Sequence, residues 1–256
     1  YNASQPLYLA DDSNYSQVFV TYYYQKGAWV LHMLRYYLGE ELFFNIIKSY
    51  AQDPQFKYKY VDTETFRAYV EEMSGKDLYN FFDQWVYDKS YPDYEYNYDY
   101  DETTGINSVT VKQTQGPNYN DRPIYDMYLP LRFSLPGGVI VEEKVFNNQM
   151  TQTYHFEHGQ EAWNLQVDPD LWIIRDLVYN NSSIPVPKPP RITSFTLPGQ
   201  VGTTVINELQ RTINLTMPAG TVLTALQPAI VLTANTSVSP VSGAAVDFSS
   251  QVQYTV

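Results

Sequence analysis

The first residues that could do chemistry are three consecutive tyrosines, Tyr22 to Tyr24, directly before a segment with a helical pattern. A phenol packs well at the entry to a helix, and its hydroxyl could also take part in chemistry. Lys26 follows Tyr24 by two residues, and His32 lies further along the expected helix. Packing is the commoner use of such residues, so their types alone favour a structural role and leave a catalytic one open.

A second group of candidate ligands lies at His155, Glu157 and His158. Histidine and glutamate bind zinc, but this spacing matches neither His-Glu-x-x-His on a helix nor its inverted form. On a strand, His155 and His158 would point to opposite faces. An exposed sheet edge is therefore favoured over a metal site. The absence of cysteine excludes thiol nucleophiles, thiolate metal sites and disulfides.

Four short helices are expected to position Tyr24 and His32. The first ends before Gly39, the second covers 40–52, the third starts at Asp62 or Thr63 and ends at Gly75, and the fourth covers 76–90 before Pro92. The apolar residues expected to form buried stripes include Val30, Leu31, Leu34, Leu38 and, in the third helix, Phe66, Tyr69, Val70 and Met73. Their spacing fits one packed helical unit.

After Pro92 the hydrophobic period changes from that of a helix to that of a strand. Tyr94, Tyr96, Tyr98 and Tyr100 alternate with acidic and amide residues, so a strand would place the phenols on one face. A core-facing row is favoured over a platform for sugar rings, and a solvated acidic face over a calcium site. Further strands are expected at 106–114, 127–135, 139–146, 151–158, 163–168 and 171–179. Together they predict a β-sandwich of about seven strands.

The rest of the chain changes composition twice. Residues 181–191 read as a stiff, proline-rich linker. Residues 192–256 are rich in Thr, Val, Ala and Ser, with turn signals between short β-branched runs, which favours an immunoglobulin-like module. The chain ends on a strand-like run, so the protein is expected to continue beyond Val256.

The net charge of −12 and pI near 4.6 disfavour nucleic acid and anionic lipid as partners. No run approaches the roughly 18 apolar residues of a membrane span, so no membrane insertion is expected. The first residues lack the plan of a signal peptide, and the chain is expected to begin in mid-protein. Twenty-five tyrosines, with abundant Asn, Thr and Ser, favour a secreted, periplasmic or cell-surface setting.

The stretch from Tyr22 to Gln52 resembles a segment of the aminopeptidase-N-like zinc metallopeptidases, the gluzincin exopeptidases. The matching positions are Tyr24, Lys26, Gly27, Ala28, His32, Met33, Leu34, Arg35, Leu38 and Gly39. The similarity continues at Ser74, Gly75, Asp77, Leu78, Phe82, Gln84, Trp85 and Pro92, and at the run 168–176. It covers roughly residues 15 to 178.

The resemblance implies a role for Tyr24. In that family a zinc ion, held by His-Glu-x-x-His and a later Glu, activates the water that attacks the scissile carbonyl. The tyrosine of the family's Tyr-x-Lys-Gly segment donates a hydrogen bond to the oxyanion. Only Tyr24 stands in that register with Lys26 and Gly27, so the resemblance assigns the catalytic role to Tyr24. Tyr22 and Tyr23 belong to the packed approach to the helix.

The chain also departs from the family pattern. The chain lacks His-Glu-x-x-His, the third ligand Glu and the Gly-x-Met-Glu-Asn segment that binds the free amino group of the substrate. All three are expected upstream of Tyr1. The chain is therefore expected to be the C-terminal part of a secreted zinc aminopeptidase acting on peptides. Alone it is expected to bind no zinc, to be inactive and to self-associate. The terminal module resembles surface and secreted modules of Bacteroidetes-type bacteria.

The expected fold class is α+β and multidomain. Residues 1–91 form the helical end of a catalytic domain, 92–180 a β-sandwich, 181–191 a linker and 192–256 an immunoglobulin-like β module. Two alternatives remain open. One is a non-catalytic carbohydrate-binding or cell-surface adhesion protein that uses the tyrosine row and the module, and the other is a scaffold whose parent has lost its zinc ligands.

Overall fold

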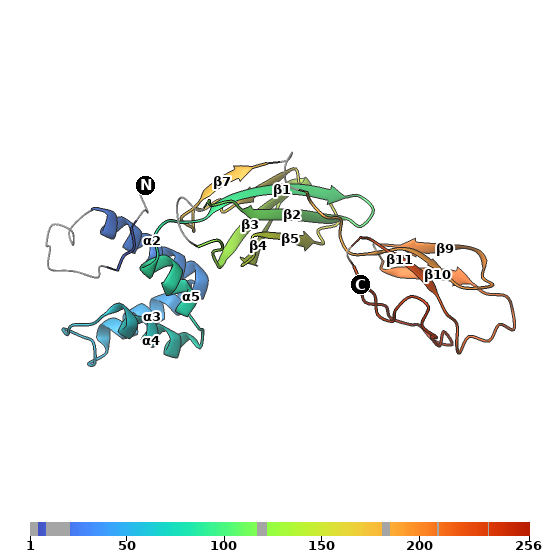
Figure 1. Ribbon diagram of the computed structural model, residues 1–256, viewed down its shortest axis with the longest axis horizontal. Coiled ribbons are helices and arrows are strands. Elements are labelled where there is room, and N and C mark those ends of the chain that lie inside the picture. Colours follow the sequence, from blue (N-terminus) through green and yellow to red (C-terminus); the bar gives the residue numbers. More distant parts are fainter. Residues whose placement is uncertain (1–4, 9–20, 117–121, 181–184, 209, 235) are drawn as a thin grey trace. The chain divides into compact units, whose positions relative to one another are not determined.

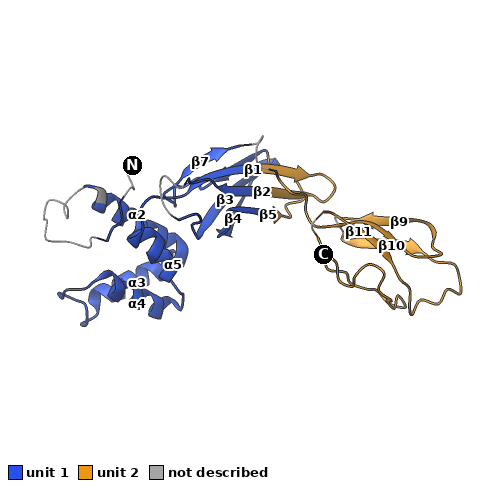
Figure 2. Cartoon of the chain, in the orientation of Figure 1, with its two compact units in different colours: residues 1–97, 110–154, 163–185 blue, residues 98–109, 155–162, 186–256 orange. Residues whose placement is uncertain are grey.

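The computed structural model describes residues 5–8, 21–116, 122–180, 185–208, 210–234 and 236–256 (Figure 1). The chain divides into two compact units, which Figure 2 colours separately. The first comprises residues 1–97, 110–154 and 163–185, and the second comprises residues 98–109, 155–162 and 186–256. No helix among the described residues is long and apolar enough to cross a membrane.

Three helices of the first unit form where the apolar spacing predicts them: α2 (Thr21–Leu38), α3 (Glu40–Gln52) and α4 (Thr63–Ser74). Gly39 separates α2 from α3 with a φ of 91°, which favours glycine because it has no Cβ. Asp62 accepts a hydrogen bond from Thr65 N at 2.8 Å and caps α4, which ends at Gly75 with a φ of 67°. The predicted start and stop signals are confirmed.

The prediction of one regular helix over 76–90 is wrong. The segment contains a short helix, α5 (Tyr79–Phe82), followed by a π-helix, η1 (Asp83–Tyr87). Asp77 Oδ1 accepts a hydrogen bond from Tyr79 N at 2.9 Å, so the helix begins only at Tyr79. In η1 the Gln84 side chain bonds to the backbone of Asp126, through Nε2 at 2.6 Å and Oε1 at 2.9 Å. Gln84 and its neighbour Trp85 are therefore both held in the interior, and the wider π turn accommodates them.

The helices enclose an apolar core. Its buried members are Val30, Met33, Leu34, Leu38, Phe43, Ile46, Val70, Leu78, Phe81, Phe82, Trp85 and Val86. Leu31 and Met73, both expected in the buried stripes, are instead 43% and 47% exposed. Leu31 lies about 100° around the helix from Val30, which takes it off the packed face.

Among the described residues that follow, seven strands form, in line with the predicted number of about seven: β1 (Asp93–Asp101), β2 (Ile106–Gln113), β3 (Met127–Leu135), β4 (Val139–Asn147), β5 (Thr151–Phe156), β6 (Asn164–Val167) and β7 (Asp176–Tyr179). They form one sheet of order β5-β2-β1-β7 and another of order β4-β3-β6. β3 pairs antiparallel with both of its neighbours, and β1 pairs parallel with β7. Leu129, Leu131 and Phe133 of β3 are fully buried, so this strand supplies much of the core.

The prediction of a strand over 171–179 is wrong for residues 171–175, which form a turn around Asp168. Asp168 is 1% exposed and has a φ of 51°. Its Oδ1 accepts a hydrogen bond from Trp172 N at 2.6 Å, and its Oδ2 accepts one from Arg175 Nε at 3.1 Å. Burial raises the pKa of Asp168 to about 6, although Trp172 N–H and Arg175 favour the carboxylate. The carboxyl group of Asp168 organises this turn through these hydrogen bonds.

The row of tyrosines on β1 is only partly a core feature. Tyr94 is 1% exposed, whereas Tyr96, Tyr98 and Tyr100 are half-buried. The hydroxyl of Tyr98 donates to Asn107 Oδ1 at 2.5 Å. The acidic side of the strand is not simply solvated either, because Asp99 pairs with Lys188 at 2.6 Å and Asp101 pairs with Arg191 at 2.8 Å.

The described residues of the C-terminal module form four strands: β8 (Ile192–Thr196), β9 (Val201–Asn207), β10 (Thr212–Thr216) and β11 (Ala229–Leu232). They form two two-stranded antiparallel sheets, β10-β9 and β11-β8. The buried core consists of Ile192, Phe195, Leu197, Ile230 and Val238. Of the expected linker, residues 181–184 lie outside the described part, and 185–191 form neither helix nor strand. A helical unit followed by several sheets confirms the predicted α+β multidomain class.

Candidate functional site

The first turns of α2 place Tyr24 and Lys26 on opposite sides of the helix. Tyr24 is 64% exposed, whereas Lys26 is fully buried. Two residues correspond to about 200° of rotation, so one side chain can face outward while the other faces inward. Tyr23 is half-buried, and the side chain of Tyr22 lies outside the described part of the chain. Tyr24 therefore presents its phenol away from the core of the helical unit.

The amine of Lys26 joins the start of α2 to two other segments. Its Nζ donates hydrogen bonds to Gln5 O and to Asp88 O, both at 2.9 Å. Gln5 belongs to the short N-terminal segment 5–8, and Asp88 follows the π-helix η1. The backbone N–H groups of Leu7 and Tyr8 also bond to Val86 O, at 2.8 and 3.2 Å. Lys26 thus fixes the part of α2 that carries Tyr24.

The buried position of Lys26 has an electrostatic consequence. Burial lowers the pKa of Lys26 from 10.5 to about 8, although the charge of Asp88 opposes this change. Because the folded-state pKa is lowered, folding favours the neutral amine. The neutral amine of Lys26 therefore contributes to the free energy of unfolding in full above the unfolded-state pKa of 10.5. This contribution is lost as the pH falls through about 8.

This linkage predicts the behaviour of a Lys26→Met variant. Methionine loses the two hydrogen bonds but carries no charge to bury. The free energy of unfolding of the variant should come closest to that of the native chain at about pH 7. At about pH 10 the difference should be larger, to the disadvantage of the variant, by up to about 3 kcal/mol. Urea unfolding of both chains at the two pH values measures the difference, in which the ionisation of tyrosines common to both cancels. A difference independent of pH would contradict the lowered pKa.

His32 is an aromatic packing partner rather than part of a cluster of ligands. Its ring stacks on Trp172, with ring centroids 4.4 Å apart and planes 9° apart. Trp172 also stacks on Tyr36 at 5.1 Å, and the Arg35 guanidinium lies 5.4 Å from its ring centre. Burial, and then the charge of Arg35, lower the pKa of His32, against a hydrogen bond with the Leu171 backbone that raises it. The neutral imidazole is therefore favoured in this stack.

Trp172 is a residue that sequence reasoning did not place at this helix. It comes from the turn organised by Asp168, which lies far from α2 in the sequence. The only signal for it was the resemblance of the run 168–176 to the end of the family's sandwich.

His155 and His158 do not form a metal site with Glu157. β5 is an edge strand, as the favoured interpretation required, and His155 Nδ1 lies 2.9 Å from Ser108 Oγ. His158 Nδ1 lies 3.2 Å from Asn107 Nδ2, and Glu157 pairs with Arg211. Across the described residues as a whole, no group of three or more His, Cys, Asp or Glu side chains could hold a metal ion.

Comparison with known families gives two matches in different parts of the chain. Residues 2–85 match the Peptidase family M1 domain, and this range includes Tyr24, Lys26 and the helices α2 to α5. Residues 192–256 match the family described as SGBP, N-terminal.

Curated relatives of the first part are aminopeptidases. Aminopeptidase 2, mitochondrial, of Saccharomyces cerevisiae is 26% identical over 195 residues, which cover 68% of this chain and 19% of the yeast protein. Aminopeptidase N of Lactococcus lactis subsp. lactis is 38% identical over 69 residues, which cover 27% of this chain and 8% of that protein. The chain thus spans about a fifth or less of the length of these relatives.

A solved structure supports the same relationship at the level of the fold. The crystal structure of Legionella pneumophila aminopeptidase A in complex with aspartic acid superposes with a TM-score of 0.59 and 14% sequence identity. The match covers 70% of this chain and 20% of that one. The resemblance found in the sequence is therefore confirmed: the first part of the chain is related to the aminopeptidase-N-like peptidases of family M1, and the C-terminal module is similar to the SGBP N-terminal family, consistent with a Bacteroidetes-type module.

Proposed function

We propose that this chain is the C-terminal part of a secreted or cell-surface zinc aminopeptidase, in which Tyr24 stabilises the oxyanion formed during peptide hydrolysis. The observation that carries the proposal is the register Tyr24-x-Lys26-Gly27-Ala28 inside the segment that matches peptidase family M1. The geometry supports it, because Tyr24 is exposed while Lys26 anchors the same turn. The proposal includes the predicted domain boundaries after residues 91, 180 and 191.

The described residues do not fit a zinc site, since they contain no cluster of suitable ligands. In the proposed peptidase the zinc ligands come from a segment outside this chain. The residues of this chain do not bind the metal. For the same reason the chain by itself is expected to hydrolyse nothing.

The contribution of Tyr24 is a positioned donor. The hydroxyl would donate a hydrogen bond to the former carbonyl oxygen of the peptide as that oxygen gains negative charge. Such a donor accelerates the reaction only if it is already in place, because a donor that must reorient gives back part of its stabilisation. The hydrogen bonds of Lys26 to Gln5 and Asp88 provide that preorganisation at the start of α2.

The proposal is tested on the longer polypeptide encoded by the parent reading frame. Purified protein should release p-nitroaniline from aminoacyl p-nitroanilides and leave the N-acetylated compounds intact, because an aminopeptidase requires a free amino group. Removal of metal with a chelator should abolish the activity, and zinc should restore it. A reading frame without His-Glu-x-x-His upstream of Tyr1, or an intact protein without this activity, would refute the proposal and favour a scaffold without metal ligands.

A second candidate, a non-catalytic carbohydrate-binding or adhesion protein, is favoured only by the similarity of the C-terminal module to the SGBP N-terminal family. The near-complete burial of Tyr94 counts against the version that uses the tyrosine row as a sugar platform. Retention of the chain on insoluble polysaccharides would support this candidate, and the absence of retention on a broad panel would remove it.

A further inference from the structure

A single arginine holds the π-helix η1 at both of its ends. Arg122, which precedes β3 in the chain, donates from Nε to Asp88 Oδ2 at 2.8 Å and from Nη2 to Asp83 Oδ2. Asp83 is the first residue of η1, and Asp88 directly follows the last one. Because a guanidinium is planar and always charged, one edge of it can hold two carboxylates in a fixed geometry. The two ion pairs form a clamp across η1, here called the Arg122 clamp.

The clamped segment supplies acceptors that hold the start of α2. Asp88 O accepts one of the two hydrogen bonds of Lys26 Nζ, at 2.9 Å. Val86 O accepts backbone hydrogen bonds from the segment 5–8, which contains the other acceptor of Lys26. A backbone oxygen lies wherever its segment is held, so the clamp helps to fix both acceptors. These acceptors in turn orient the turn of α2 that carries Tyr24.

The clamp matters most at the C-terminal end of η1. Near the start of η1, the side chain of Gln84 is already bonded to the backbone of Asp126. At the far end the backbone of Asp88 is extended, with a φ of −99° and a ψ of 164°, so Asp88 O points out of the helical pattern. The side chains of Arg122 and Asp88 are 24% and 28% exposed, so water screens their ion pair less than it screens a pair on the open surface. Arg122 therefore ties the chain to the sandwich at the residue that accepts from Lys26.

We propose that Arg122 is a positioning residue for Tyr24, an inference that rests on the proposed function of Tyr24 as the oxyanion donor. Arg122 acts through the hydrogen bond between Asp88 O and Lys26 Nζ. By holding Asp88 O within reach of Lys26, it keeps the phenol of Tyr24 in place before the oxyanion forms, which is the condition for effective stabilisation. Loss of the clamp lets the start of α2 shift, and a displacement of about 1 Å in a catalytic group can cost about a hundredfold in rate.

Steady-state kinetics of the full-length peptidase on an aminoacyl p-nitroanilide tests this role. Arg122→Met should lower kcat by about tenfold to a hundredfold and change KM by less than about twofold. Arg122→Lys keeps the charge but not the planar edge, so it should recover part of the loss, and it carries the test if Arg122→Met does not fold. The matched control is Arg132→Met, because Arg132 is 26% exposed and also joins two carboxylates, Glu142 and Asp170, which lie outside η1 and α2. Its kcat should stay within about twofold of the native value.

A double variant separates positioning of the phenol from a general structural role. If Arg122 acts through Tyr24, adding Arg122→Met to Tyr24→Phe should lower kcat no further, because no hydroxyl remains to be misplaced. A full further loss in the Tyr24→Phe background, or a loss in Arg122→Met no larger than in Arg132→Met, would overturn the inference and leave the assignment of Tyr24 intact. A native kcat in Tyr24→Phe would instead refute the proposed function, and this inference with it.

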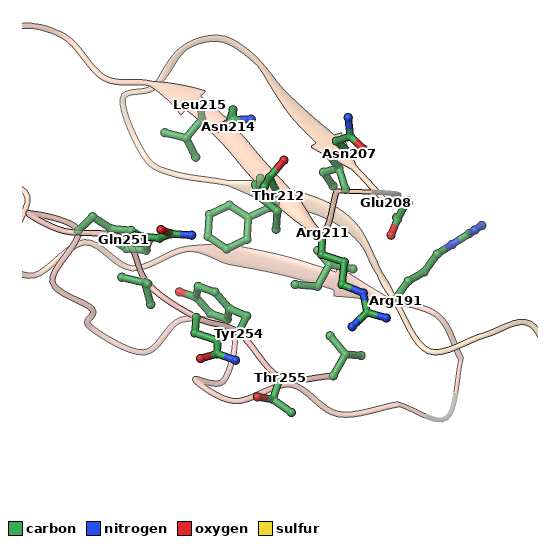
Figure 3. A pocket seen from close by; sticks show the side chains of 18 of the residues that line it. Arg191, Asn207, Glu208, Arg211, Thr212, Asn214, Leu215, Gln251, Tyr254 and Thr255 are labelled. Carbon is green, nitrogen blue, oxygen red and sulfur yellow. The ribbon is translucent and has the colours of Figure 1, made fainter. Parts of the chain in front are cut away.

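Hydrogen exchange of the same variants gives a readout that does not depend on catalysis. In Arg122→Met the segment 5–8 and the start of α2 should exchange faster than in the native protein, because their acceptors are then less firmly held. Arg211→Met is the control from the second unit, where Arg211 pairs with Glu157 and lines an open cavity (Figure 3). It should leave exchange in both segments unchanged. Native exchange rates in Arg122→Met, or equal increases in the two variants, would overturn the inference.

Discussion

Replacing Tyr24 with phenylalanine in the proposed full-length peptidase should lower kcat by about two to three orders of magnitude, because loss of one oxyanion donor typically costs about 3 to 4 kcal/mol of transition-state stabilisation. The loss should appear in kcat rather than in KM, since the oxygen becomes a strong acceptor only as its charge develops. Tyr24 is 64% exposed, so removal of its hydroxyl should leave the fold intact. Steady-state kinetics on an aminoacyl p-nitroanilide measures the effect, and thermal unfolding checks the fold.

The neighbouring tyrosine provides the control for this prediction. Tyr23→Phe makes the same chemical change one residue earlier, on a side chain that is half-buried rather than exposed. Its kcat should stay within a few-fold of the native value. Near-normal activity of Tyr24→Phe, or an equal loss in the two variants, would rule out the specific assignment of Tyr24 as the oxyanion donor.

Replacing Asp168 with alanine should cost about 3 to 5 kcal/mol of unfolding free energy, the largest stability effect expected for this chain. The change removes the carboxylate that accepts the Trp172 N–H and pairs with Arg175. It leaves Arg175, whose side chain is only 15% exposed, without this ionic partner. It also places alanine at a φ of 51°, which a residue with Cβ and no polar side chain rarely adopts. Urea unfolding followed by tryptophan fluorescence measures the loss.

Asp168→Asn separates the contributions. Asparagine tolerates the left-handed backbone and keeps an oxygen that can accept the Trp172 N–H, but it has no charge for Arg175. Its loss should therefore be clearly smaller than that of Asp168→Ala. If the two variants were equally destabilised, the charge would account for the whole effect. If alanine were tolerated without loss, the turn would not depend on Asp168.

Most of the elements could be predicted from the sequence because their signals are local. Gly39 and Gly75 end helices through their own backbone freedom, and Asp62 caps its helix three residues away. The failures occur where a side chain competes with the regular backbone pattern. The apolar run after Asp168 reads as a strand, yet the carboxylate draws its N–H groups into a turn. In η1, a bond with the backbone of Asp126, distant in sequence, holds Gln84 in the interior and changes the helix type.

The candidate site likewise combines residues that could be predicted from the sequence with residues that could not. Tyr24 follows from the resemblance in register, but nothing in the local pattern predicts that Lys26 is buried, since lysine is rarely placed in an interior. Its acceptors, Gln5 O and Asp88 O, are backbone atoms that any sequence would supply, so they leave no trace in residue types. Trp172 is equally unpredictable, because its partner His32 lies in a different element and the two meet only after the chain has folded.

The contact of Trp172 with α2 also bears on how this part of the chain unfolds. The helices and most of the sandwich strands belong to one compact unit, in which Trp172 stacks on His32, Lys144 Nζ donates to Tyr36 O at 2.7 Å, and Gln84 pairs with Asp126. Melting of the sandwich would strip α2 of these neighbours, and fraying of α2 would expose Trp172. We therefore expect the helical unit and the sandwich to unfold together, so that the rigidity of the turn that carries Tyr24 would depend on a β-structure encoded more than a hundred residues later.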